Sequence, residues 1–142
     1  LDLPENQVTD VSPLQGVTSL TRLWLFDNQI TDISHLQGLT SLTELGLAGN
    51  QINDASPLRG LTSLTDLDLS SNEIGDIASL QTLASLTSLQ LSDNLISDIS
   101  ALVANSGLDS GDTVYLTGNS LNSDAISSQV PALGARGGTV YI

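Results

Sequence analysis

The sequence predicts an α/β fold in which one short unit repeats along the chain and stacks into a right-handed solenoid. Two observations predict it: asparagine recurs at a constant interval, and leucines alternate just before each asparagine. The interval is 22 residues for Asn6, Asn28, Asn50, Asn72 and Asn94. Asn119 follows 25 residues after Asn94, so the last unit carries an insertion of three residues. Because one unit cannot bury its apolar face alone, we expect successive units to stack with a parallel sheet on the concave face.

Four full copies of the unit follow the pattern L-x-x-L-x-L-x-x-N-x-I, which is the signature of leucine-rich repeats. They occupy residues 17–38, 39–60, 61–82 and 83–104. Their wording, as in LTSLTELGLAGNQINDAS, resembles the internalin-like repeats of bacterial surface proteins. The resemblance implies a leucine-rich repeat solenoid from a secreted or cell-surface protein of a bacterium.

The repeats are expected to form a single domain with the residues that follow them. Residues 1–104 contain a partial first copy and the four full copies, and residues 105–142 are a modified last repeat with a C-terminal helical cap. In this tail a helical stretch begins near Ser123, is expected to be interrupted at Pro131, and is followed by a last strand. The chain begins within a repeat, so we expect it to be a fragment of a longer protein.

Each unit should contain one strand and one short convex segment. The alternation of Leu23 and Leu25 predicts a strand whose leucines point into the core. The pairs Ser12-Pro13 and Ser56-Pro57 predict a serine N-cap followed by a short 3₁₀ or irregular helical piece.

The recurring asparagine is expected to be structural. At the end of each strand the backbone polar groups leave the sheet, and an asparagine side chain can both donate to them and accept from them. We call the stacked set the Asn ladder: Asn6, Asn28, Asn50, Asn72, Asn94 and Asn119.

The charge of the chain excludes several functions. It has 16 acidic residues, three arginines and no lysine, for a net charge of −13, which disfavours nucleic acids and anionic membranes. No apolar run is long enough to insert into a membrane, and the absence of cysteine excludes disulfides. No catalytic constellation accompanies the lone His35, so we expect neither an enzyme nor a cofactor.

A column of aspartates recurs at the start of the convex segments: Asp10, Asp32, Asp54, Asp76 and Asp98. Calcium could bridge stacked carboxylates of this kind. The alternative is that each aspartate accepts a local backbone N–H, and because the column has no cluster of additional ligands we favour that alternative and predict no metal site.

The outward positions of the strands carry the candidate site. All four aromatic residues of the chain fall there, whereas the core positions are aliphatic. Trp, Tyr and Arg are enriched at binding hot spots, and the concave sheet of a solenoid is the usual binding surface. The predicted partner-binding residues are Arg22, Trp24, Phe26, Glu44, Asp66, Asp68, Gln90 and Tyr115.

We therefore predict a non-catalytic module that recognises a protein, or else a glycan, through its concave face. Two alternatives remain at this point. The chain could be a passive spacer of a larger adhesin, with Trp24 and Phe26 only packing on Gly46 and Ala48. It could also be a targeting module of a multidomain enzyme.

Overall fold

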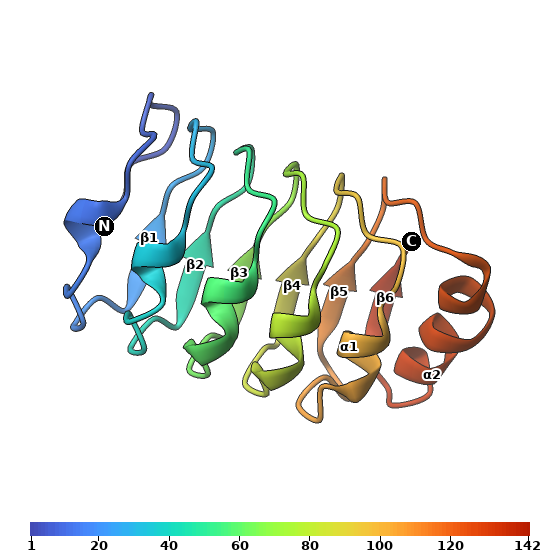
Figure 1. Ribbon diagram of the computed structural model, residues 1–142. Coiled ribbons are helices and arrows are strands. Elements are labelled where there is room, and N and C mark those ends of the chain that lie inside the picture. Colours follow the sequence, from blue (N-terminus) through green and yellow to red (C-terminus); the bar gives the residue numbers. More distant parts are fainter.

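The computed structural model describes all residues, 1–142, and shows six parallel strands in chain order (Figure 1). The strands are β1 (Arg22–Trp24), β2 (Glu44–Gly46), β3 (Asp66–Asp68), β4 (Ser88–Gln90), β5 (Thr113–Tyr115) and β6 (Thr139–Tyr141). Asp2 adds a single parallel bridge to Trp24 at the N-terminal edge. The predicted parallel sheet of a leucine-rich repeat solenoid is thus confirmed.

The helical segments lie on the side of the solenoid opposite the sheet (Figure 1). Four of them are 3₁₀-helices: η1 (Ser12–Leu14), η2 (Ser34–Leu36), η3 (Ser56–Gly60) and η4 (Ala78–Thr82). The fifth, α1 (Ser100–Ala104), is a short α-helix, although a 3₁₀ or irregular segment was expected. The last unit contains η5 (Ala125–Gln129), which is π-helical, followed directly by α2 (Val130–Gly134).

The predicted serine N-caps are wrong in one respect. The serine hydroxyls do not cap these helices; the aspartate two residues earlier does. The Oδ1 atom of Asp10 accepts the Ser12 N–H at 2.7 Å, and Asp54 accepts the Ser56 N–H at 2.8 Å. Because the donor is a backbone N–H, the cap does not depend on serine, and Asp76 caps Ala78 in the same way at 2.8 Å.

A continuous core fills the space between the sheet and the helices. It contains 32 buried hydrophobic residues, all of them Leu, Ile, Val or Ala. In every internal unit the two inward leucines, such as Leu45 in β2 and Leu47 directly after it, are fully buried, whereas Glu44, the first residue of β2, is half-buried. The alternation therefore separates a fold-forming side of each strand from an outward side.

The Asn ladder joins each turn to the one before it. The Nδ2 group of Asn50 donates to the Leu47 carbonyl of its own turn and to the Leu25 carbonyl of the preceding turn, both at 3.0 Å. Its Oδ1 accepts the Ile30 N–H, also at 3.0 Å. Asn6 differs from this pattern, because it is exposed and donates only to the Pro4 carbonyl.

The C-terminal tail is helical, as expected, but Pro131 does not interrupt the stretch. It is the second residue of α2, which continues η5 without a break, and the helical run changes next to this proline from π-helical to α-helical geometry. Arg136 donates to the carbonyls of Val103 and Asn105 at 3.0 and 2.7 Å and so ties this segment to the end of α1. That the segment acts as a cap stays a prediction.

Candidate functional site

The register of the sheet places all the predicted binding residues except Phe26, which follows β1, in two adjacent columns. One column runs Arg22, Glu44, Asp66, Ser88, and the other runs Trp24, Gly46, Asp68, Gln90. At the start of the first column Arg22 Nε lies 3.6 Å from Glu44 Oε1. The side chains are 65% and 31% exposed, so this pair is a surface ion pair worth little energy.

Trp24 and Phe26 form a stacked aromatic pair. Their ring centroids are 5.3 Å apart with 25° between the planes, and both residues are half-buried. Both rings lie over Gly46, which is buried although it faces outward. A Cβ atom at Gly46 would overlap both rings, so the pair depends on glycine at this position.

A hollow of about 170 Å³ opens beside the aromatic pair on the concave face. Its floor includes Leu45 and Leu67, and its polar side is formed by β3 and β4. We call it the concave hollow; beyond that floor it is lined by Trp24, Phe26, Asp66, Asp68, Ser88 and Gln90. Ser88 is the one polar member that the sequence analysis did not single out, because its residue type carries no strong signal for binding.

The carboxylates in the concave hollow are only partly engaged by the chain. Asp66 Oδ2 accepts the Thr65 hydroxyl at 2.8 Å, and Asp68 Oδ1 accepts the backbone N–H of Ser70 at 3.0 Å. The one ion pair in the chain is that of Arg22 with Glu44, so neither aspartate has a cationic partner. The hollow therefore combines apolar ring surface with uncompensated negative charge.

Tyr115 does not line the concave hollow, although it was predicted with the other site residues; it lies on β5, beside Gln90 of β4. Its ring stacks on that of Tyr141 in β6, with centroids 4.7 Å apart and 7° between the planes. Tyr141 is 49% exposed and was missing from the predicted set. The concave face thus carries two aromatic pairs, and the first of them borders the concave hollow with its two acids.

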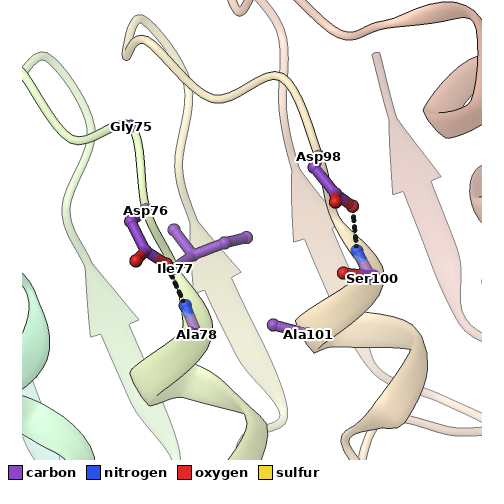
Figure 2. Close-up of a pocket in the computed structure, with 7 residues that line it drawn as sticks. All are labelled: Gly75, Asp76, Ile77, Ala78, Asp98, Ser100 and Ala101. Atoms are coloured by element: carbon purple, nitrogen blue, oxygen red, sulfur yellow. Dashed lines mark hydrogen bonds between the residues drawn. The ribbon is translucent and has the colours of Figure 1, made fainter.

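The convex aspartate column has a local explanation. In Figure 2, Asp76 and Asp98 lie on either side of a hollow of about 220 Å³, and each accepts one backbone N–H, from Ala78 and Ser100 respectively. The same backbone hydrogen bond lowers the pKa of Asp98, and the equivalent bonds lower the pKa of Asp10 and Asp32. The column therefore acts as a row of helix caps.

Other groups that the sequence analysis missed are structural. Asn105 is fully buried, donates to the Leu80 and Leu83 carbonyls at 2.9 and 3.1 Å, and accepts the Gly107 N–H. Because Asn105 lies outside the regular asparagine interval, the sequence gave no signal for its structural role.

None of the helices has the length and apolar character needed to cross a membrane.

This geometry defines a class of protein: a leucine-rich repeat solenoid with an open concave sheet. A family model described as "Leucine Rich repeats (2 copies)" matches residues 1–38, 40–82 and 62–110. The chain belongs to the leucine-rich repeat family, and its repeats are of the internalin-like bacterial type. A search of curated proteins gave no significant match.

Three solved structures that are similar to the chain come from two bacteria. An internalin (inlF) from Listeria monocytogenes aligns with a TM-score of 0.82 and 32% identity over 99% of this chain and 43% of its own. The internalin C2 (inlC2) of the same organism aligns with a TM-score of 0.74 and 34% identity, over 99% of this chain and 67% of its own. A leucine-rich repeat protein from Leptospira interrogans shares the fold, with a TM-score of 0.84 and 23% identity over 96% of this chain and 35% of its own. The chain thus spans less than half the length of the first and third of these proteins.

Proposed function

We propose that the chain is a non-catalytic recognition module that binds a protein partner through its concave face. The observation that carries the proposal is the concave hollow, where ring surface from Trp24 and Phe26 meets two carboxylates that have no cationic partner in the chain. Solenoids of stacked repeats present extended surfaces of this kind to their partners. Aromatic anchors beside a hollow are also typical of the residues that dominate binding energy.

The likeness to internalins supports a location outside the bacterial cell, either secreted or on the cell surface, with a protein of another cell as the partner. A glycan is the second candidate ligand, favoured by the stacked pair of the half-buried Tyr115 and the exposed Tyr141. A targeting role within a multidomain enzyme would use the same face.

A passive spacer is the competing function, and one observation favours it. The rings of Trp24 and Phe26 rest on Gly46 within the chain and so shield part of their own surface. Both residues nevertheless remain half-buried, not buried, and they form one wall of an open hollow. A spacer does not require either feature.

The proposal is tested by capture of a partner with the immobilised chain from extracts of host cells and of neighbouring bacteria. The variant Trp24→Ser/Phe26→Ser removes the aromatic wall and leaves the 32-residue core intact. We expect it to lose the partner that the original chain captures. The matched control is Leu95→Ser, which removes a hydrophobic side chain that is 63% exposed and lies outside the concave hollow.

Unfolding curves of both variants show whether the fold survives. If the folded double variant captures the same partner in the same yield as the original chain, the concave hollow is not the binding site.

A further inference from the structure

We propose that the concave hollow binds the guanidinium group of an arginine side chain presented by the partner. The inference rests on the proposed recognition function and specifies the chemistry of one contact within it. Three features support it: the aromatic wall, the two carboxylates and the charge of the surrounding surface.

The aromatic wall fits the stem and the planar head of arginine. Trp24 and Phe26 both line the hollow, so the methylene groups of a long side chain can pack against the rings while its charged end stays hydrated. A guanidinium near the face of a Trp or Phe ring is also attracted by the ring quadrupole.

The two carboxylates provide acceptors on the opposite wall. Asp66 and Asp68 are alternate residues of β3, so both project from the same face of the sheet. The internal bonds of each carboxylate go to one oxygen, Oδ2 of Asp66 and Oδ1 of Asp68, and the other oxygen of each has no hydrogen bond within the chain. A guanidinium has five N–H donors in a fixed plane, enough to reach both carboxylates and the Gln90 side-chain carbonyl.

The charge of the hollow distinguishes between ligand classes. No cation lines it, and Arg22 outside it already pairs with Glu44, so a phosphate or an acidic glycan would meet only repulsion. A neutral sugar would leave both carboxylates uncompensated. Lysine supplies the charge, but its compact ammonium neither stacks on a ring nor bridges two acceptors as a guanidinium does.

The test is an NMR titration of the full chain with three small probes: acetyl-arginine amide, acetyl-lysine amide and acetyl-citrulline amide. Citrulline has nearly the shape of arginine but no charge. We expect arginine to shift the Trp24 indole N–H and the backbone amides of β3 and β4 in a saturable manner. Citrulline should bind about tenfold more weakly, since it loses the cation–π and ionic contacts, and lysine should fall between the two.

The variant Asp66→Asn/Asp68→Asn keeps an oxygen that can accept the hydrogen bonds from Thr65 and Ser70, so the fold should be retained. It should weaken arginine binding by about tenfold. The control Glu73→Gln neutralises an exposed acid outside the hollow and should leave binding unchanged. Equal binding of citrulline and arginine, or shifts centred on the convex aspartates instead, would overturn the inference.

Capture of the partner separates this inference from the function on which it rests. If Asp66→Asn/Asp68→Asn captures the partner as well as the original chain, while Trp24→Ser/Phe26→Ser does not, the arginine contact is wrong and recognition by the concave face stands. If both variants capture the partner fully, the concave-face function itself fails.

Discussion

Gly46 lies beneath the ring of Phe26, so close that a Cβ atom on the glycine would overlap the ring. The overlap extends to the neighbouring ring of Trp24. The aromatic pair of one strand therefore depends on the absence of a side chain on the next strand. This dependence gives a substitution that perturbs the pair without altering either aromatic residue.

Gly46→Ala should force both rings away from the sheet. Overpacking of this kind costs about 1–3 kcal/mol of unfolding free energy, and the emission of Trp24, the only tryptophan of the chain, should shift towards that of a solvated indole. Gly38→Ala is the control, because a Cβ atom there meets no other atom within 4 Å. Urea unfolding and fluorescence spectra measure both effects. An unchanged spectrum of Gly46→Ala would show that the rings do not rest on this residue.

Asn72→Ala should destabilise the chain by about 1–3 kcal/mol, because it leaves buried backbone groups without partners. The lost bonds are those to the Leu47, Leu69 and Ser70 carbonyls and from the Ile52 N–H. Asn6→Ala is the matched control, since Asn6 occupies the same position of the repeat but is exposed and makes a single bond. Denaturant unfolding should show a large loss for Asn72 and a small one for Asn6; equal losses would contradict the ladder as a source of stability.

Stability should fall in acid partly because of Asp98. The Ser100 N–H lowers the pKa of this carboxyl below its ordinary value of 3.8. A lowered pKa in the folded state adds stability that is present above pH 3.8 and is lost as the pH falls through the folded pKa. Asp98→Asn should therefore lose less stability than the original chain as the pH falls below this value.

Glu73→Gln provides the control for Asp98→Asn, because it makes the same change in net charge at an exposed side chain without a hydrogen bond. Unfolding free energies measured over the acidic range compare the three proteins. Identical acid profiles of the original chain and Asp98→Asn would exclude the aspartate cap as a contributor.

Salt should stabilise the chain. A net charge of −13 destabilises the compact state through repulsion between like charges, and added ions screen that repulsion. We expect the midpoint of thermal unfolding to rise with NaCl from low ionic strength to about 1 M, where the screening length is about 3 Å. A midpoint that stays constant or falls would show that the acidic surface has little influence on stability.

The sequence predicts much of this fold because the core repeats. Leu45 and Asn50 recur at fixed intervals, and stacking identical units leaves one solution for where they lie. Repetition does not predict how the outward side chains, which differ from copy to copy, contact one another. Trp24 and Phe26 were placed on the outward face, but the hollow depends on their lean over Gly46 and on side chains two and three strands away.

The left-handed backbone conformation of the residue before each ladder asparagine could not be predicted from the sequence for a similar reason. Asp27 and Ser71 both have φ near 52°, in the left-handed region where glycine is common, and each directly precedes an asparagine of the ladder. Gly49 and Gly118 occupy the same place in their own turns with φ of 67° and 77°. The mixture of glycine, aspartate, serine and, at Glu5, glutamate at one position obscures a conformation that all the turns share.

Because core positions and outward positions are separate on each strand, the number of repeats sets the distance between outward residues that contact a partner. Since the full copies have the same length and their strands pair in chain order, we expect that inserting or removing an entire copy between β2 and β5 would preserve the register of the sheet. Each such change would move Tyr115 relative to Trp24 by one interstrand spacing, about 4.8 Å. The distance between two contact residues can therefore change by whole interstrand spacings to match the partner. The chemistry of each contact can change separately, by substitution of one outward side chain.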